Sequence, residues 1–242
     1  FLFVVLLTQT LYAAGDDSSS KLRSGPEKVA LLELYTSQGC SSCPPADRWL
    51  SGLGRNTGLW AQFVPVAFHV DYWDYIGWRD PFSQHRFSLR QRRYAKEGGV
   101  GIVYTPAILL DGREWRNWTR GAVPNVVDEA AGILTVKRAA GRLSVSYVPV
   151  VQPDAELFAN IALLGSGLVS NVTAGENRGQ KLLNDFTVLK MEHVTLHRDR
   201  ESFKTTLSDF EPNKAPVRTA LAVWINKSGS QKPLQAVGGW YR

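Results

Sequence analysis

The sequence contains little sulfur and few histidines. Its 242 residues include 2 Cys, 1 Met and 4 His. A structural zinc site takes about four ligands, mostly Cys and His. His193 and His197 have the four-residue offset of some metal ligands, but they lie far from the cysteines in a segment typical of a strand. We therefore predict no metal ligands and no cofactor.

Long apolar runs and strong charge are also absent. No run approaches the roughly 20 residues that span a bilayer, so we expect no stable membrane span once a signal segment is removed. The net charge is +6, and the basic residues are scattered apart from one knot on residues 86–96 (Arg86, Arg90, Arg92, Arg93 and Lys96). A nucleic-acid surface needs a concentrated basic face, so we expect no nucleic-acid partner. A hydrophobic fraction of 44% excludes a mostly disordered chain.

The N-terminal residues have the pattern of a targeting segment. Phe1–Leu7 is entirely apolar, small residues follow as far as Ala14, and Gly15–Ser20 is polar. This order is typical of the apolar core and cleavage region of a secretory signal peptide. No basic leader precedes Phe1, so we expect the natural chain to begin upstream. We assign residues 1–25 to a signal peptide remnant and linker, with a retained membrane anchor as the alternative, and expect a periplasmic or secreted protein.

The pattern changes along the chain. Strands are predicted at residues 28–35, 63–70, 107–110 and 113–118, and helices at 46–53, 81–96 and 123–136. Asp111-Gly112 is a strong hairpin signal. After about residue 140, strands are predicted at 142–148, 157–164, 182–195, 203–207 and 217–226, which is typical of an antiparallel sandwich. We predict an α/β domain over residues 26–140 and a β-sandwich-like domain over 141–242, with the boundary near Ala140-Gly141.

Both cysteines lie in one short motif, Cys40-Ser41-Ser42-Cys43, after a predicted buried strand and before a predicted helix. A structural disulfide of this length would constrain the unfolded chain little, so a redox dithiol fits better. Helix N–H groups and the helix dipole stabilise a thiolate at a helix start. We expect Cys40 to be the exposed nucleophile and Cys43 the resolving thiol. Pro44-Pro45 follows directly and removes two amide donors, which leaves the degree of acidification of Cys40 open.

The segment GIVYTPAILLDG, residues 101–112, resembles the stretch around the cis-proline of the thioredoxin superfamily. By this resemblance Pro106 is cis, and Thr105 packs beside the disulfide and pairs its backbone with a substrate chain. The stretches LELYTSQGCSSCPPAD, HVDYWDYIGWRDPFS and GENRGQKL resemble an uncharacterised family of secreted thioredoxin-like proteins, a domain of unknown function. The resemblance implies an α/β thioredoxin-like domain, a mixed sheet flanked by helices, followed by a β-rich, sandwich-like C-terminal domain.

An aromatic loop follows the second predicted strand. If the first two strands are parallel, this loop, residues 71–80, rises beside Cys40. Its Trp73 and Trp78 either form a substrate groove or seal the loop onto the core. His69 and Asp71 are candidates for tuning the thiol, because nearby charges shift a thiol's pKa. A buried, hydrogen-bonded His69 is the alternative.

These observations lead to one functional expectation and one alternative. We expect an exported thiol–disulfide oxidoreductase that acts on protein disulfides through Cys40 and Cys43. Its partners would be exported proteins carrying thiols or disulfides, together with a redox partner. The alternative is a soft-metal (copper) handling or protein-binding module, in which both cysteines and His69 hold the ion. Ser41-Ser42 does not fix whether the protein oxidises, reduces or isomerises.

Overall fold

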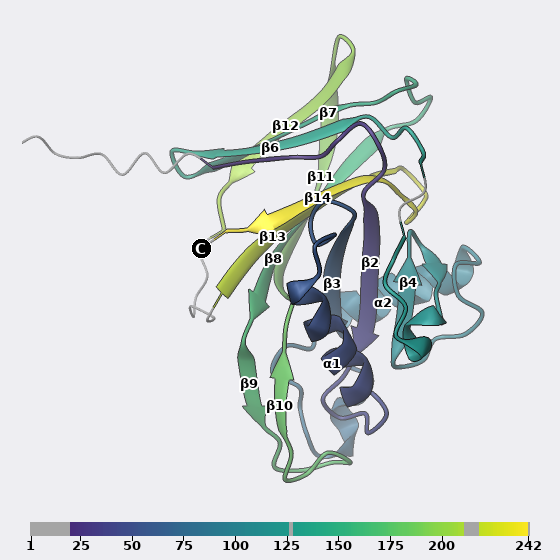
Figure 1. Cartoon of the computed structure of the whole chain (residues 1–242), viewed down its shortest axis with the longest axis vertical. Coiled ribbons are helices and arrows are strands. Elements are labelled where there is room, and N and C mark those ends of the chain that lie inside the picture. The colour runs from purple at the N-terminus through teal and green to yellow at the C-terminus, as the bar shows by residue number, and fades with distance from the viewer. Residues whose placement is uncertain (1–19, 126–127, 211–217, 242) are drawn as a thin grey trace, which may run out of the picture.

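A large mixed β-sheet forms the centre of the computed structural model, which describes residues 20–125, 128–210 and 218–241 (Figure 1). Nine of its 12 strands follow the order β1-β6-β7-β12-β11-β3-β2-β4-β5, and β8, β13 and β14 branch from β11. β9 and β10 form a separate two-stranded hairpin. The strands are β1 (Ser20–Arg23), β2 (Ala30–Thr36), β3 (Phe63–His69), β4 (Ala107–Leu110), β5 (Arg113–Glu114), β6 (Ile133–Ala139), β7 (Arg142–Val148), β8 (Leu157–Ser166), β9 (Leu168–Asn171), β10 (Lys181–Asn184), β11 (Thr187–Asp199), β12 (Ser202–Ser208), β13 (Arg218–Lys227) and β14 (Pro233–Trp240). The helices are α1 (Pro44–Gly52) and α2 (His85–Lys96), with short 3₁₀ turns at Leu53–Arg55, Asp74–Ile76 and Asn117–Arg120.

The predicted fold class, a helix-flanked α/β thioredoxin-like domain followed by a separate sandwich, is wrong. The described part of the chain is mostly β, with 46% of its residues in strands and 15% in helices. The physical reason lies at the edge of β3, where Thr187 of β11 pairs in parallel with Ala67. A strand from the second half thereby extends the sheet of the first half, and β8 and β13 continue it. The strands of the second half therefore join one sheet with β2 and β3.

Two local predictions in the first half are also wrong. The helix predicted at 123–136 is absent from the described part of that range, and Ile133–Ala139 forms β6 instead. Its side chains alternate between buried Leu134 and Val136 and more exposed neighbours, which is the period of a strand. The strand predicted at 113–118 ends at Glu114, and a 3₁₀ turn follows at Asn117–Arg120.

Most other elements are confirmed. The strands predicted at 28–35, 63–70, 107–110, 142–148, 157–164 and 203–207 correspond to β2, β3, β4, β7, β8 and β12, and the predicted helices at 46–53 and 81–96 to α1 and α2. The predicted strand at 182–195 is two strands, β10 and β11, which separate at Phe186 with φ +54°. Asp111 and Gly112 both have positive φ, as the predicted tight hairpin requires.

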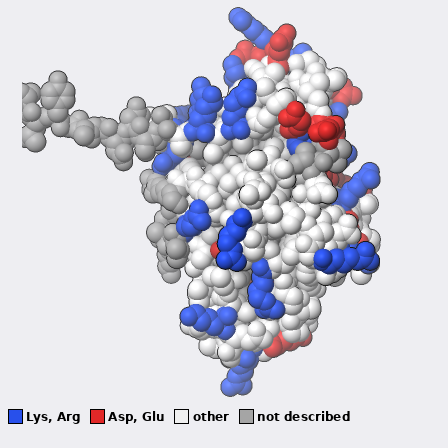
Figure 2. Space-filling model, viewed as in Figure 1, with Lys and Arg blue, Asp and Glu red and all other residues white. Residues whose placement is uncertain are grey.

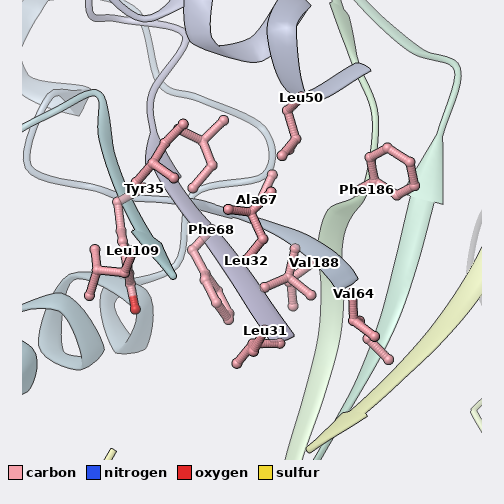
Figure 3. Packing of buried hydrophobic residues seen from close by; sticks show 14 of the residues in the cluster. Leu31, Leu32, Tyr35, Leu50, Val64, Ala67, Phe68, Leu109, Phe186 and Val188 are labelled. Carbon is pink, nitrogen blue, oxygen red and sulfur yellow. The ribbon is translucent and has the colours of Figure 1, made fainter. Parts of the chain in front are cut away.

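The main hydrophobic cluster draws on both halves of the chain. Around β2 and β3, Figure 3 shows Leu32 and Ala67 lying near Leu50 of α1, Val188 of β11 and Phe186, which precedes that strand. These side chains are nearly inaccessible to solvent. β2 is buried along its whole length because α1, the β4 segment and the second-half strands surround it.

The predicted domain boundary lies in a tight turn. Ala140 and Gly141 both have positive φ and connect β6 to β7, which pair with each other. The division into two domains stays a prediction. The predicted signal segment lies largely outside the described residues, while residues 20–23 of the predicted linker form β1 against β6. Within the described ranges, no helix has the length and apolar character needed to cross a membrane.

Candidate functional site

The two cysteines lie between the end of β2 and the start of α1. Both are free thiols, and Cys40 and Cys43 are only 1% and 0% exposed. α1 begins at Pro44, immediately after Cys43, because a proline is tolerated in the first turn, where its missing N–H would have no helical partner. The carbonyl of Cys43 accepts the amides of Ala46 and Asp47, so the dithiol is part of the helix start. The expectation that Cys40 is exposed is not met in this conformation.

The surroundings of the two sulfurs push their pKa values in opposite directions. A hydrogen bond from Cys43 is the largest influence on Cys40 and, with Ser42 and Thr105, outweighs burial and lowers its thiol pKa to about 6. The Ser42 hydroxyl lies 3.1 Å from Cys40 Sγ, and the Thr105 effect comes from its side chain. The Thr105 carbonyl, 3.8 Å from Cys40 Sγ, accepts a hydrogen bond from the protonated thiol. Burial, with the neighbouring Cys40 and Asp47, raises the pKa of Cys43 well above its usual value. Cys40 is therefore the thiolate at neutral pH, and Cys43 keeps its proton.

Thr105 and Pro106 lie beside the dithiol, and their peptide bond is cis, as the resemblance implied. The Thr105 carbonyl faces Cys40, and its hydroxyl oxygen accepts a 2.7 Å hydrogen bond from Trp73 Nε1. Gln91 of α2 donates to the carbonyl of Tyr104 at 2.6 Å and holds the same segment from the other side. The segment that precedes β4 is thus fixed against the aromatic loop and against the turn of residues 37–43, which we name the redox turn after the dithiol that it carries and the expected chemistry.

Asp47 is a site residue that the sequence reasoning missed. It lies four residues after Cys43, and Thr36 Oγ1 donates to its carboxylate at 3.1 Å. Burial raises the pKa of Asp47 to about 7, against the opposing influence of His69 and Thr36. Its charge also contributes to the high pKa of Cys43. The sequence signal that could have identified Asp47 is its spacing, because an acid four residues after Cys43 lies on the same helix face.

His69 and Asp71 have different surroundings. His69 is buried, and its Nδ1 lies 2.7 Å from Asp80 Oδ2. Burial lowers the pKa of His69, but Asp80 more than offsets this, so the net shift is upward. Asp71 instead contacts the hydroxyl of Ser88 and Nδ1 of His85 on α2. The groups that set the pKa of Cys40 most strongly are Cys43, Ser42 and Thr105, so tuning by His69 or Asp71 stays a prediction.

The aromatic loop, residues 71–80, packs closely on the redox turn. A Cβ placed on Gly39 would lie 3.1 Å from Trp73 Cβ and 3.2 Å from Ile76 Cδ1, so a larger residue at position 39 would require the loop to shift by a few tenths of an ångström. Trp78 Nε1 donates to the side-chain oxygen of Gln38 at 3.2 Å. The rings of both Trp73 and Trp78 are half-buried. The two tryptophans therefore lie against the residues that precede Cys40 and against Thr105, with their indole N–H groups bonded within the protein.

A second loop, residues 172–180 between β9 and β10, holds the redox turn from the other side. Asn177 is 0% exposed, and its Nδ2 donates to the carbonyls of Gln38 at 2.9 Å and Cys40 at 3.0 Å. The carboxylate of Glu176 accepts the amide of Ser41 at 2.9 Å. We name these two residues the clamp. The sequence Gly175-Glu176-Asn177-Arg178-Gly179 gives no signal of this role, because the backbone groups that it contacts are distant in the sequence.

Two further observations concern the surface charge around the site and its capacity to bind a metal. On the face that carries α1 and the β9–β10 hairpin, Lys and Arg side chains are spread among neutral surface (Figure 2). Within residues 20–125, 128–210 and 218–241, no three side chains of His, Cys, Asp or Glu are placed to hold a metal ion. The soft-metal alternative stays a prediction that a metal titration tests.

Comparisons with known proteins identify relatives without supplying a chemistry. A family model described as "Protein of unknown function (DUF1223)" matches residues 31–226. The crystal structure of protein AGR_C_4864 from Agrobacterium tumefaciens is similar, with a TM-score of 0.59, 22% identity, and coverage of 89% of this chain and 95% of that one. HBP35 of Porphyromonas gingivalis has a TM-score of 0.58 and 12% identity, over 89% of this chain and 76% of that one. Among the curated proteins, none matches. At these identities the likeness shows the fold alone.

Proposed function

The chain belongs to the DUF1223 family of proteins of unknown function, and we propose that it is a thiol–disulfide oxidoreductase that uses Cys40 and Cys43. The observation that carries the proposal is the asymmetry of the pair. Cys40 has a pKa lowered to about 6, whereas that of Cys43 is raised. The thiolate is the nucleophile in disulfide exchange, so Cys40 attacks a disulfide first and Cys43 stays protonated until the second step.

The first step is attack by the Cys40 thiolate on one sulfur of a substrate disulfide. A mixed disulfide forms between Cys40 and that sulfur, and the other substrate sulfur leaves as a thiolate. The Thr105 carbonyl, 3.8 Å from Cys40 Sγ, lies at the point where a substrate backbone would approach. Because Cys40 is only 1% exposed, a protein substrate reaches it only after the surrounding loops move.

The second step is attack by Cys43 on the mixed disulfide. Cys43 must first lose its proton, and its raised pKa disfavours this. Asp47, with a pKa raised to about 7, is an acceptor whose proton affinity is matched to neutral pH. The Cys43 thiolate then attacks Cys40 Sγ, forms the Cys40–Cys43 disulfide and releases the second substrate sulfur as a thiolate. The two substrate thiolates take up the proton held by Asp47 and one from solvent. The protein gains one disulfide and the substrate loses one, so two electrons pass to the substrate. The reverse sequence oxidises it.

The relationship to the thioredoxin superfamily enters this proposal only at the level of the site. A strand, a CxxC turn at a helix start and a neighbouring cis-proline segment occur together here, as they do in that superfamily. We propose that the exchange chemistry is shared. We extend the proposal to an exported setting, with partner proteins that carry thiols or disulfides, because the apolar segment Phe1–Leu7 has the pattern of a signal peptide.

Trapping of the mixed disulfide tests the proposal. With a protein disulfide such as insulin as the probe, Cys43→Ser should accumulate a covalent adduct on Cys40 that a reductant releases, because no resolving thiol remains. Cys40→Ser is the matched control and should form none. Peptide mapping should locate the adduct at Cys40. A lack of adduct in Cys43→Ser, with the folded protein confirmed by circular dichroism, would overturn the proposal.

A further inference from the structure

A cavity of about 370 Å³ lies between α2 and β11, and shares no lining residue with the dithiol site. Arg86, Arg90 and Arg93 line it from α2, where spacings of four and three residues place them on one helix face. Glu192 and His193 of β11 line the opposite side. These arginines belong to the basic knot of the sequence, which the proposed function leaves without a role.

The arginines differ in how far their charges are neutralised. Arg90 is buried and forms two hydrogen bonds to the Glu33 carboxylate, at 2.9 and 3.2 Å, so its charge is matched inside the protein. Arg86 donates to the carbonyl of Met191 and the side-chain oxygen of Gln84, which are neutral acceptors. The guanidinium group of Arg93 has no hydrogen-bond or ion-pair partner within the described part of the chain. The two positive charges of Arg86 and Arg93 therefore outnumber the one negative charge in the cavity lining, that of Glu192.

A buried amide of the cavity lining has an unused donor. Gln231 is 7% exposed, and its Oε1 accepts a 2.9 Å hydrogen bond from Arg90 Nη1. Its Nε2 has no partner among the described residues. Because a buried N–H group without an acceptor costs free energy, such groups are rare in folded proteins. This N–H group has almost no accessible surface, so an acceptor in the cavity reaches it once the Gln231 side chain turns toward the space that the residue lines.

The pKa of His193 indicates the sign of the electrostatic potential in the same cavity. Its Nδ1 lies 2.9 Å from Asn160 Oδ1, so this nitrogen donates and the ring is oriented by β8. Burial lowers the pKa of His193, and the charges of Arg90 and Arg93 lower it further. His193 is therefore neutral at pH 7, in a positive field that favours an anion.

We propose that this cavity binds a small oxyanion, a carboxylate or phosphate group, through Arg86, Arg93 and the Nε2 amide of Gln231. The guanidinium groups supply charge-assisted hydrogen bonds, which planar oxyanions and phosphates accept in pairs. The Gln231 amide is buried and held by Arg90, so its N–H group would fix the orientation of the bound oxyanion. The volume accommodates a small metabolite or a single acidic side chain, and the chemistry recognised is the oxyanion itself.

The test uses the full chain, with inorganic phosphate and succinate as probes at constant ionic strength, and sodium chloride as the reference salt. Binding is followed by calorimetry and by the proton resonances of the 4 histidines. A bound anion should raise the pKa of His193, because it favours the imidazolium form. The resonances of His197, which does not line the cavity, should not move when the anion is added. The His193→Gln variant assigns the resonance. Phosphate and succinate distinguish a preference for a phosphate group from one for a carboxylate.

Arg93→Gln and Arg92→Gln form a matched pair, since both remove one exposed charge from neighbouring positions of α2. Only Arg93 lines the cavity. Arg93→Gln should weaken binding about tenfold or more, the usual effect of losing one charge-assisted contact, while Arg92→Gln should bind like the parent. Equal weakening in both variants, or shifts that sodium chloride reproduces, would show only general screening and overturn the proposal. Failure of both probes to bind would do the same, and would leave the dithiol proposal untouched because no residue is shared.

Discussion

At the scale of single residues, Cys40 and Cys43 show how two thiols in one turn acquire different chemistry. Both are buried, and burial raises the pKa of any thiol. Cys40 receives hydrogen bonds from Cys43, Ser42 and Thr105 that favour its thiolate. Cys43 meets the charges of Cys40 and Asp47, which oppose a second anion. In the proposed function, these neighbours set the order in which the two sulfurs attack.

Asp47→Asn provides a pH-dependent test of this arrangement. The pKa of Asp47 rises from an ordinary value of 3.8 to about 7 in the folded protein, so the folded state binds this proton more tightly than the unfolded state. The carboxylate therefore costs stability as the pH rises from about 4 to about 7, and the cost is complete above that range. Asparagine does not ionise. Asp47→Asn should be more stable than the parent at pH 8, by a few kcal/mol at most because Asp47 is half-buried, and should show no gain at pH 4.

Urea unfolding of the reduced protein at pH 4 and pH 8 measures this difference. Asp80→Asn is the control of opposite sign, since hydrogen bonds and His69 lower the pKa of Asp80 and its carboxylate stabilises the fold above its unfolded pKa. That variant should lose stability at pH 8. An Asp47→Asn gain of equal size at both pH values would show that charge is not its cause. The same variant should also slow resolution of the mixed disulfide, because Cys43 loses its proton acceptor.

The sequence predicted those site residues whose relationship is local. Cys40 and Cys43 are three positions apart, and Thr105 directly precedes Pro106, so a motif sufficed. Asp80 accepts the amide of Gln38 from 42 positions away, and Asn177 reaches the Cys40 carbonyl from 137 positions away. No periodicity links such residues. Their roles depend on tertiary contacts, which a single sequence does not display.

At the scale of elements, three loops meet over the dithiol. Ile76 of the aromatic loop lies between Gly39 of the redox turn and Gly175 of the β9–β10 loop, since a Cβ on either glycine would approach its Cδ1 to 3.2 or 3.0 Å. The clamp adds hydrogen bonds from Asn177 and Glu176 to the redox turn. The low exposure of Cys40 is thus a property of interlocked loops, and loosening one of them should change access to the sulfur.

Asn177→Asp tests the clamp. The substitution replaces a donor with a carboxylate oxygen that faces two carbonyls, so the redox turn should open more often. Two hydrogen bonds of about 1 kcal/mol each predict that Cys40 alkylation at pH 9, where its thiolate is fully formed, becomes about 30-fold faster. Iodoacetamide rates measured against pH separate this plateau from the midpoint, which reports the pKa. Gln180→Ala is the control, because Gln180 also contacts Asn177 but not the turn. A plateau unchanged in Asn177→Asp would argue against the clamp.

Separate substitutions of Trp73 and Trp78 test the aromatic loop. Trp73 packs against the main hydrophobic cluster and bonds to Thr105, so Trp73→Ala should lose about 1–3 kcal/mol, less than a fully buried tryptophan. Trp78 contacts Gln38 at the edge of the redox turn. Trp78→Ala should keep its stability but react several-fold more slowly with a protein disulfide, at an unchanged rate with a small aromatic disulfide. Equal slowing with both reagents, after correction for folded fraction, would make Trp78 a packing residue.

At the scale of the whole molecule, the sequence did not predict which strands pair with one another. Residue alternation and apolar runs located β2, β3, β7 and β8, because side-chain periodicity is local. The sheet becomes one body where Thr187 of β11 pairs with Ala67 of β3, and no pattern in either segment indicates that these edges meet. The resemblance to thioredoxin-like proteins correctly implied the cis bond at Pro106 and wrongly implied the surrounding fold.

The continuity of the sheet leads to a prediction about cooperativity. Phe186 belongs to the second half of the chain, yet it is 1% exposed in the main cluster and packs edge-on against Trp60 with ring centroids 5.8 Å apart. If residues 26–140 and 141–242 fold independently, Phe186→Ala should destabilise the second part much more than the first. Because the cluster is shared, we expect it to destabilise both by the same amount, about 3–5 kcal/mol.

Two probes decide between these outcomes. In a Cys40→Ser background, labelling of buried Cys43 reports unfolding of the first part, and hydrogen exchange of the β13 amides reports the second. Across a urea series the two should give one midpoint, and Phe186→Ala should move both together, as a single cooperative unit requires. Leu183→Ala, at a position on β10 that is 50% exposed, should move neither. Parts that share one hydrophobic core unfold together, so two separate midpoints would exclude a shared core. With only the β13 probe sensitive to Phe186→Ala, they would instead establish the domain boundary at Ala140-Gly141.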